Sequence, residues 1–359
     1  MPEIEIVDAA SPERLAPFDA IIDARSPAEF AEDHIPGAIN LPVLDNDERA
    51  RVGTIYVQDS PFRARKIGAA LVARNVARHL ETALADKPGS FRPLVYCWRG
   101  GQRSGAMATI LSQVGWRTAL LKGGYKTYRR RVQHRLYEAE LGLDLVLLDG
   151  PTGCGKTAVL QRLAGLGVQV LDLEGLAEHR GSLFGALPGR PQPSQKLFES
   201  RLVSAIQDLD PARPVVVEAE ASKIGERMTP PALWRAMQAA PRITLAAPAP
   251  ARAAYLVEAY ADIVADPAAL AAAIARLPVH PGRQRIADWQ ALADAGAWAE
   301  LALSLMEHHY DPAYARADRK DERRCLGTVE LPDLGEGALA AAAERVAALG
   351  GGLSPGRTR

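Results

Sequence analysis

The sequence has 359 residues, 48% of them hydrophobic and 24% charged, so it is long enough for two domains with apolar cores and too apolar for a disordered chain. Its 43 basic and 43 acidic residues balance, which excludes nucleic-acid binding through overall charge; such binding would need a local basic patch. The three cysteines Cys97, Cys154 and Cys325 lie far apart, so a disulfide framework is not expected.

Targeting and membrane segments are not predicted. The opening stretch MPEIEIVDAASPERL is acidic and lacks an apolar run, unlike a secretory signal. No apolar run reaches the roughly 18 residues that a membrane-spanning helix needs. We therefore expect a cytoplasmic, monomeric protein that does not associate with membranes.

The first third of the chain alternates predicted strands and helices. Residues 20–24 form an apolar strand that carries an acid at its end. Ser26, Pro27 and Glu29 then supply a helix cap, a first-position proline and a capping-box glutamate. A long helix is predicted over residues 61–86, and further strands over 93–96 and 116–121. This alternation predicts a parallel α/β sheet.

One cysteine, Cys97, stands between the buried strand 93–96 and a helix predicted from Arg103 onward with Ser104 as its cap. The glycines of this turn let backbone N–H groups converge into an anion-binding nest. The nest, the helix N-terminus and the nearby arginines would favour a thiolate. Cys97 is therefore the candidate nucleophile, or the carrier of a sulfur-like atom. The candidate anion-binding residues are Trp98, Arg99, Gly100, Gly101, Gln102, Arg103 and Ser104.

Three stretches, IIDARSPAEFAEDHIPGAINLP, YCWRGGQRS and LLKGGY, occur in this order and together resemble a rhodanese domain. The resemblance implies that Cys97 carries a transferable atom, as rhodanese cysteines carry persulfide sulfur. One spacing differs: five residues separate Cys97 from Arg103, as in cysteine phosphatases, where common single-domain rhodaneses have four. The wider loop could hold a tetrahedral oxyanion, which suggests a donor that carries a phosphate.

Residues 126–140, KTYRRRVQHRLYEAE, form a predicted basic helix between the two halves of the chain. Two interpretations stay open: a solvated linker helix, or a stripe of side chains that contact phosphates. In the second interpretation the contacting residues are Lys126, Arg129, Arg130, Arg131 and Arg135.

The second half begins with a phosphate-loop motif. A predicted strand over residues 143–149 runs into GPTGCGKT, which has the pattern G-x-x-x-x-G-K-T, and an amphipathic helix follows. Strand, loop and helix are the context that supports this motif. The glycines let the backbone approach a diphosphate, and Lys156 and the helix N-terminus supply positive potential. Thr157 would hold Mg²⁺ if a metal accompanies the phosphates. The candidate diphosphate-binding residues are Gly150, Gly153, Cys154, Gly155, Lys156 and Thr157.

Acidic residues follow the next predicted strands, at 168–172 and 214–218, with another strand at 243–245. Ligands of open α/β sheets bind at the carboxyl ends of strands, so these acids are candidates for a base or a metal-associated role. For any single one of them, an ordinary function at a strand end or as a helix cap is the simpler explanation. The residues are Asp172, Glu174, Glu218 and Glu220.

The remaining chain is predicted to be mostly helical. Residues 179–185 form a glycine-rich loop of lid-like composition, and helices are predicted at 195–209, 253–265, 267–277, 284–295 and 298–310. His308 and His309 lack partners at metal-ligand spacing, so no metal site is predicted.

The whole chain resembles the bacterial tRNA 2-selenouridine synthase family. The stretches that carry this resemblance are YCWRGGQRS, GPTGCGKT, EGLAEHRGSLFG, PSQ before a helix, and LMEHHYDPAY. It implies an α/β fold in two parts: a rhodanese-like parallel-sheet domain with the basic linker helix over residues 1–137, and a P-loop α/β domain with a helical extension over 138–359.

The family resemblance also implies a chemistry. Such an enzyme acts on wobble 2-thiouridine in the anticodon loop of certain tRNAs. It attaches a geranyl group from geranyl diphosphate to the sulfur, then replaces the S-geranyl group using selenophosphate. Here Cys97 would carry selenium as a selanyl sulfide, its loop would bind selenophosphate, the P-loop would bind diphosphate, and the basic helix would contact tRNA. Both donors are co-substrates, and no cofactor is firmly implied. The helical region between residues 251 and 310 is apolar enough to line a geranyl pocket, although core packing explains it more simply.

Three alternatives remain. One is a persulfide sulfurtransferase with an ATPase or regulatory P-loop domain. Another is a phosphatase, although Tyr96 replaces the histidine usual before the cysteine and no clear general acid is present. The third is a non-catalytic nucleotide-binding sensor, which the intact Cys97 argues against.

Overall fold

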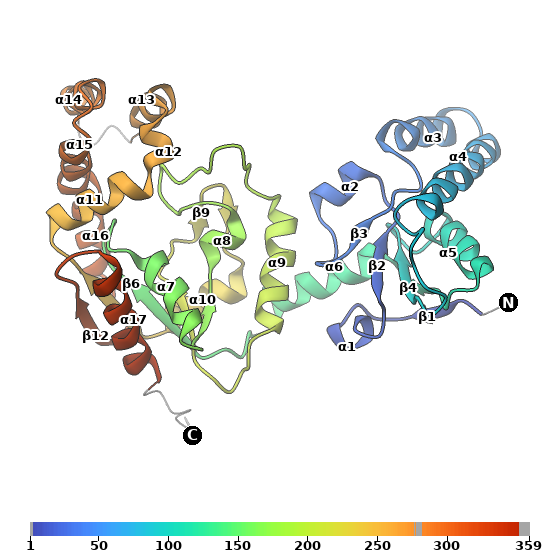
Figure 1. Cartoon of the computed structure of the whole chain (residues 1–359), viewed down its shortest axis with the longest axis horizontal. Helices are drawn as coiled ribbons and strands as arrows, with labels where there is room; N and C mark the ends of the chain where they lie inside the picture. Colours follow the sequence, from blue (N-terminus) through green and yellow to red (C-terminus); the bar gives the residue numbers. More distant parts are fainter. Residues whose placement is uncertain (1–2, 276, 278–281, 352–359) are drawn as a thin grey trace. The chain divides into compact units, whose positions relative to one another are not determined.

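The structure is a computed structural model that describes residues 3–275, 277 and 282–351 (Figure 1). The chain divides into two compact units. The first comprises Met1–Ala139 and Pro193–Ser204, and the second comprises Glu140–Gln192 and Ala205–Arg359. A segment from the later part of the sequence, most of helix α9 (Gln195–Gln207), therefore belongs to the first unit. Each unit is an α/β structure built on its own parallel five-stranded sheet.

The sheet of the first unit has the strand order β1-β5-β4-β2-β3, and all its pairings are parallel. Its strands are β1 (Glu5–Val7), β2 (Ala20–Asp23), β3 (Ile39–Asn40), β4 (Pro93–Tyr96) and β5 (Ala119–Leu121). Its helices are α1 (Pro12–Leu15), α2 (Pro27–Glu32), α3 (Asn46–Gln58), α4 (Pro61–Glu81), α5 (Gln102–Val114), α6 (Tyr125–Gln133) and the π-helix η1 (His134–Glu138).

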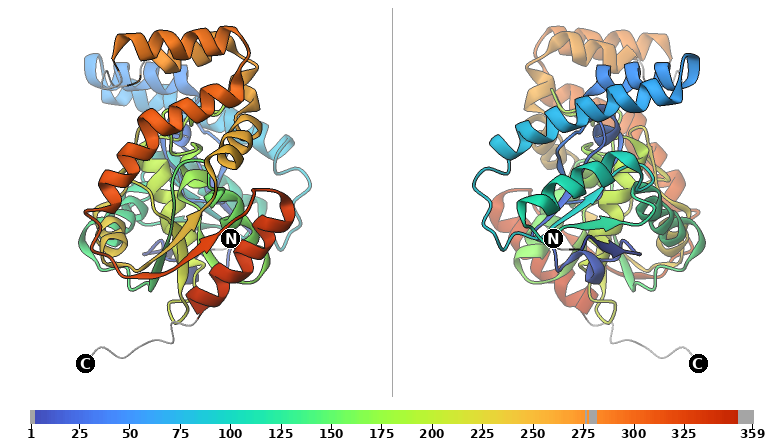
Figure 2. Two further views of the ribbon diagram at one scale, coloured as in Figure 1. Left: turned by 90° about the vertical axis from the view of Figure 1, so that its left-hand side faces the viewer. Right: turned by 90° about the vertical axis from the view of Figure 1, so that its right-hand side faces the viewer.

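The central strand β4 is buried along its whole length. Helix α5 packs on β4 and β5, and α4 packs on α5 (Figure 2). Met107 and Leu111 of α5 meet Val72 and Val76 of α4 in one apolar cluster, which explains the apolar spacing of both helices. This packing fixes the end of β4, where Cys97 begins the loop into α5.

Most predicted elements of this unit are present, with three corrections. The capping box at Ser26 is confirmed, since the Ser26 amide donates to Glu29. The helix predicted over 61–86 ends at Glu81, and α3 was not predicted because none of its residues is buried and it lacks an apolar face. Ser104 is not a helix cap: α5 begins at Gln102, one residue before the predicted start, its cap position is Gly101, and Ser104 is buried against the cysteine.

The sheet of the second unit has the order β12-β11-β6-β8-β7, again with parallel pairings throughout. Its strands are β6 (Leu145–Asp149), β7 (Gln169–Leu171), β8 (Val215–Glu218), β11 (Arg242–Ala246) and β12 (Cys325–Glu330), and a small hairpin joins β9 (Lys223–Ile224) to β10 (Arg227–Met228). Its helices are α7 (Lys156–Gly165), α8 (Leu173–Ala177), α10 (Pro231–Ala239), α11 (Ala249–Ala259), α12 (Ala261–Val264), α13 (Pro267–Ala275), α14 (Arg283–Asp294), α15 (Trp298–Leu305), the π-helix η2 (Met306–Tyr310), α16 (Asp311–Asp318) and α17 (Glu336–Gly351).

The four strands predicted in this half are present, and β12 is an addition. Only Val329 of β12 is buried, so its sequence lacks the apolar run that identified the others. The single helix predicted over 253–265 is two helices, α11 and α12, separated at Tyr260. Among the described residues, no helix is both long and apolar enough to cross a membrane.

Candidate functional site

Cys97 lies directly after β4, at the bottom of the loop that leads into α5. Its side chain is buried, with 3% of its surface exposed. The hydroxyl of Ser104 lies 3.1 Å from the Cys97 Sγ and 3.3 Å from the carbonyl oxygen of Gly101. A hydroxyl in this position can donate to sulfur and stabilise negative charge there. Ser104, expected to cap the helix, is therefore a direct partner of the cysteine.

The stretch LLKGGY closes the other side of the Cys97 loop. The amide of Tyr125 donates to the Cys97 carbonyl oxygen at 2.8 Å, and the amide of Lys126 donates to the Trp98 carbonyl oxygen at 3.2 Å. Gly124 has a positive φ of 58°, and a Cβ there would overlap the Cys97 carbonyl. Only glycine allows the backbone at position 124 to lie this close to the Cys97 carbonyl, so Gly124 helps to hold the Cys97 loop in place.

The two arginines of the loop have different surroundings. The guanidinium of Arg103 donates to both carboxylate oxygens of Glu29, at 2.6 and 3.2 Å. Burial acts to raise the pKa of Glu29, but the ion pair with Arg103 outweighs it and the pKa is lowered. The charge of Arg103 is thus matched within the protein, whereas Arg99 is exposed. Of the other predicted loop residues, Trp98 stacks on Tyr125 with ring centres 5.2 Å apart.

The P-loop occupies the corresponding place at the end of β6, the central strand of the second sheet. Gly150, Gly153 and Gly155 all have positive φ values, and a Cβ on Gly150 would lie 2.6 Å from the carbonyl oxygen of Leu245. The ammonium group of Lys156 donates to the Gly150 carbonyl oxygen at 2.9 Å, so the lysine lies over the loop. Cys154 is fully buried and faces the apolar core. Two loop amides are used within the protein, since Gly150 donates to Asp149 and Cys154 donates to the Pro151 carbonyl oxygen. The N-terminus of α7 and Lys156 are the groups that would attract a diphosphate.

Three carboxylates gather beside the P-loop. Oxygen atoms of Glu174, Glu218 and Glu220 lie within 4.8 Å of one another, and the hydroxyl of Thr157 donates to Glu174 at 3.1 Å. Burial and then the neighbouring carboxylates raise the pKa of Glu174 to about 9. Burial also raises the pKa of Glu218 to about 7. Among the described residues, no hydrogen-bond donor reaches either oxygen of the fully buried Glu218.

Asp172 does not belong to this carboxylate group. Its side chain accepts a hydrogen bond of 2.7 Å from the Gly175 amide and caps α8. The ordinary capping function, left open for all four acids, therefore holds for Asp172. The acid that joins Glu174 and Glu218 is Glu220, which follows β8 two residues after Glu218.

Comparison with known proteins matches both halves of the chain. Residues 8–131 match the model of the rhodanese-like domain, and residues 143–274 match the model of the tRNA 2-selenouridine synthase AAA domain. The tRNA 2-selenouridine synthases of Cupriavidus pinatubonensis and Shewanella halifaxensis are each 32% identical to the chain, over 85% and 84% of its length and 90% of theirs. The chain belongs to the tRNA 2-selenouridine synthase family.

A further member, from Bdellovibrio bacteriovorus, is 37% identical over 65% of the chain and 62% of its own length, so this match spans less than two thirds of that relative. Both candidate sites fall inside the matched domains: Cys97 in the rhodanese-like domain, and the P-loop with Glu174, Glu218 and Glu220 in the AAA domain. Helices α14 to α17 and strand β12 lie beyond the residues that either domain model covers.

A buried ionic network next to the Cys97 loop of this family member was not predicted. Arg25 is 1% exposed, pairs with Asp23 at 2.6 Å and lies 4.1 Å from the centre of the Tyr125 ring. The Tyr125 hydroxyl donates to Asp33 at 2.6 Å. Burial raises the pKa of Asp33, and hydrogen bonding, including that from Tyr125, and then the nearby cations only partly offset that effect. The network fixes Tyr125, whose amide holds the Cys97 carbonyl.

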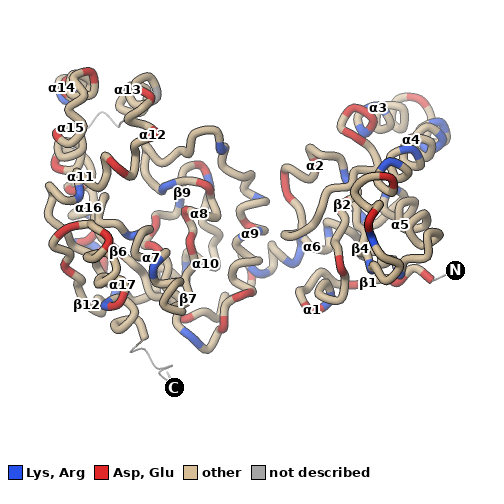
Figure 3. Tube along the Cα trace, in the orientation of Figure 1, with Lys and Arg blue, Asp and Glu red and all other residues tan. Residues whose placement is uncertain are grey.

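The basic helix α6 carries several lysines and arginines (Figure 3), and their side chains differ in burial and in partners. The Arg129 guanidinium pairs with Glu199 and lies 3.7 Å from Asp33, so its charge is neutralised inside the first unit. Arg129 therefore does not fit the predicted phosphate-contacting stripe. Lys126 and Arg130 are exposed, while Arg131 and Arg135 are half-buried.

Two further arginines beside the P-loop were not singled out from the sequence. Arg180 lines the same pocket as Lys156, and its guanidinium pairs with Asp262 at 2.9 Å and lies over the Tyr260 ring. Arg252 donates to the Thr152 carbonyl oxygen at 3.0 Å and pairs with Asp311, so it braces the loop. The sequence marked the stretch around Arg180 as a glycine-rich loop, but nothing in its composition indicated that this arginine shares a pocket with Lys156.

Proposed function

We propose that this chain converts wobble 2-thiouridine of tRNA to 2-selenouridine in two steps, S-geranylation and then selenium exchange. The observation that carries the proposal is the pairing, in one member of this family, of Cys97 in an anion-binding loop with a complete P-loop in a separate sheet. Two loops for two anions suit a reaction with two phosphate-bearing donors, geranyl diphosphate and selenophosphate.

The first step is assigned to the P-loop. The sulfur of 2-thiouridine attacks C1 of geranyl diphosphate, the C1–O bond breaks with its electron pair going to diphosphate, and the base loses its N3 proton. The protein must hold the diphosphate and accept its developing charge. The loop amides, Lys156 and Arg180 are placed for that role. Diphosphate needs no γ-phosphate contact, so ATP has no part in this step.

The carboxylate group beside the loop suits a magnesium ion. Three carboxylates and the Thr157 hydroxyl are hard oxygen ligands, and the unpartnered, fully buried oxygens of Glu218 lack a cation. We propose that Glu174, Glu218, Glu220 and Thr157 would hold Mg²⁺, which would neutralise charge on the diphosphate. Mg²⁺ should raise the Tm of the wild type but not that of Glu218→Gln. The control is Glu300→Gln, which changes an exposed carboxylate and should keep the Tm increase. An equal Tm increase in Glu218→Gln would show that Mg²⁺ does not bind at this site.

The second step is assigned to Cys97. Selenophosphate supplies selenium at the selenide level, so the exchange needs no oxidant: C2–Se forms, C2–S breaks, geranyl thiol leaves, and water cleaves the selenium–phosphorus bond to give phosphate. We place the Cys97 sulfur beside the incoming selenium. A Cys97 selanyl sulfide is two electrons more oxidised than a thiolate plus selenophosphate, so forming one calls for an electron acceptor. The mass of the intact protein after incubation with selenophosphate alone tests for that adduct.

Nucleoside mass spectrometry of thiolated tRNA tests the whole proposal. Geranyl diphosphate alone should give S-geranyl-2-thiouridine, and geranyl diphosphate with selenophosphate should give 2-selenouridine, both without ATP. A strict ATP requirement would favour a sulfurtransferase with an ATPase domain instead. Unchanged thiouridine under all conditions would contradict the proposal.

A further inference from the structure

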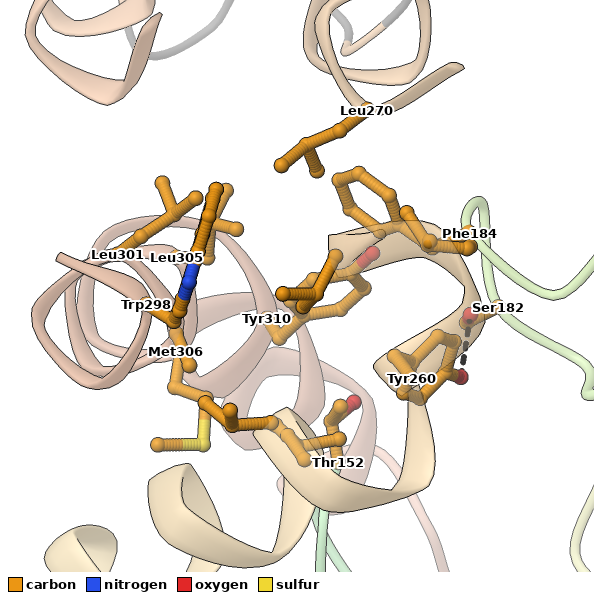
Figure 4. A pocket seen from close by; sticks show the side chains of 15 residues that line it. Thr152, Ser182, Phe184, Tyr260, Leu270, Trp298, Leu301, Leu305, Met306 and Tyr310 are labelled. Carbon is orange, nitrogen blue, oxygen red and sulfur yellow. Dashed lines mark hydrogen bonds between the residues drawn. The ribbon is translucent and has the colours of Figure 1, made fainter. Parts of the chain in front are cut away.

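An apolar cavity adjoins the P-loop inside the second unit. Its walls come from Thr152 of the loop, the segment around Phe184, helices α11, α12 and α15, and the π-helix η2, with Leu270 of α13 at one side. Figure 4 shows Thr152 at one end of this cavity and Leu270 at the other. The cavity volume is about 90 Å³, and it is about 610 Å³ when the space that opens to solvent is counted.

The cavity lies next to the pocket lined by the P-loop, Lys156 and Arg180, here called the phosphate pocket, and the two share a wall. Thr152, Ser182, Leu256, Tyr260 and Tyr310 line both spaces. The two spaces are therefore adjacent. A ligand with its anionic head at Lys156 would reach the cavity with an apolar chain that passes Leu256 and Tyr260.

The polarity of the lining changes along the cavity. Its hydroxyl groups, from Thr152, Ser182, Tyr260 and Tyr310, belong to residues that also face the phosphate pocket. Two of them satisfy each other, since the Ser182 and Tyr260 hydroxyls lie 2.8 Å apart (Figure 4). The more distant lining is hydrocarbon and aromatic, including Phe184, Leu270, Trp298, Leu301 and Leu305. Such a gradient matches a ligand with a charged head and an apolar tail.

Packing within the apolar core does not fully bury the side chains that line this cavity. Phe184, Ile263, Trp298 and Tyr310 pack against the apolar cluster of Leu270, Leu301 and Leu305 yet remain only half-buried. Apolar surface left in contact with water costs free energy in proportion to its area. A hydrocarbon ligand would remove that exposed area, whereas the adenosine of ATP would bring polar groups to walls that offer few partners.

We propose that this cavity holds the hydrocarbon chain of the prenyl diphosphate, and that its far end at Phe184 and Leu270 limits the chain length. This inference rests on the proposed function, because it places the geranyl donor's tail. The scissile C1–O bond would then lie at the shared wall, with diphosphate on the P-loop side and the isoprenoid chain beyond Tyr260.

Calorimetry on the full chain tests the tail site apart from catalysis. The two probes are inorganic diphosphate and geranyl diphosphate. Each buried methylene is worth about fourfold in affinity, so geranyl diphosphate should bind at least about 100-fold more tightly than diphosphate. Its binding should also carry a more negative heat-capacity change.

Two variants and a matched control locate the tail. Ala302→Phe fills the cavity and should weaken geranyl diphosphate at least about tenfold while leaving diphosphate binding unchanged, which also shows that the variant is folded. Phe184→Ala lengthens the cavity and should raise the affinity for farnesyl relative to geranyl diphosphate about tenfold. Leu183→Ala changes the exposed neighbour of Phe184, outside the lining, and should alter neither ratio.

The outcomes separate this inference from the proposed function. Equal affinities for diphosphate and geranyl diphosphate, or ratios unmoved in both variants, would overturn the tail site even if the enzyme geranylates tRNA. Tight, cavity-dependent binding of geranyl diphosphate without any transfer to thiolated tRNA would support the tail site and overturn the proposed geranylation.

Discussion

The Cys97 loop and the P-loop use the same backbone device for different chemistry. Each follows the central strand of a parallel sheet and leads into a helix, the arrangement that predicts an anion-binding loop in both. The first loop has a thiol with a hydroxyl partner at its base, and its arginine is matched by Glu29. The second has a lysine, a carboxylate group and an apolar cavity beside it.

This difference indicates which anion each loop suits. The Cys97 loop is held by the Tyr125 amide and by the close approach of Gly124, and its sulfur is buried, so we assign to it the smaller of the two proposed anions, selenophosphate. The P-loop opens into two spaces, one polar and one apolar, which suits a long amphiphilic diphosphate. The comparison predicts that a substitution in one loop abolishes only the step assigned to that loop and leaves the other step intact.

The largest expected effect is that of Cys97→Ser on selenium incorporation. Removing a side chain that contacts the reacting atoms can cost at least about a thousandfold in rate, so loss of the sulfur beside the incoming selenium should bring 2-selenouridine below detection. S-geranyl-2-thiouridine should still form and should accumulate, because the P-loop is untouched. Nucleoside mass spectrometry measures both products, and normal selenouridine formation by the variant would remove Cys97 from the second step.

Lys156→Ala is the reciprocal change and should have the next largest effect. Loss of a cation at a developing phosphate charge costs about 10²–10³ in kcat, so geranylation should fall by that factor. The variant should still convert chemically geranylated tRNA to selenouridine at the wild-type rate, because that reaction uses the Cys97 loop. A loss of both activities, with unchanged Tm, would mean that the two loops do not act separately.

The sequence predicted what short stretches of chain determine. Cys97 with its loop, the P-loop and their flanking strands and helices follow from apolar runs and from glycines at fixed offsets. The capping box at Ser26 is equally local. These features depend on residues within one or two turns of each other, so one sequence is enough to recognise them.

What the sequence could not predict depends on contacts between distant residues. The charge of Arg129 is directed inward by Glu199, 70 positions away, and Arg103 is held by Glu29, 74 positions away. Glu220 lies near Glu174 because of how the strands and loops pack, which their spacing in the sequence does not reveal. Asp172, closer to Glu174 in the sequence, caps α8 instead. The edge strand β12 was not predicted because only one of its residues is buried, which gives the sequence no apolar pattern.

The smallest expected effect concerns the proposed contacts of helix α6 with tRNA. Lys126 and Arg130 are the exposed cations of α6 in the predicted stripe, four residues apart on one helix face. If they contact tRNA phosphates, the double substitution to alanine should weaken tRNA binding and lower the slope of log affinity against log salt concentration by about 1.4–1.8.

The matched control for this change is the pair Arg74→Ala and Arg78→Ala on α4. Both arginines are exposed, and they have the same four-residue spacing in the same unit. Their loss removes the same charge, so any general electrostatic effect on tRNA should appear in both double variants. A lower salt slope only in the α6 variant would identify specific phosphate contacts. Equal slopes in the two variants would reduce α6 to a solvated helix, and tRNA would then have to reach the two loops by other surfaces.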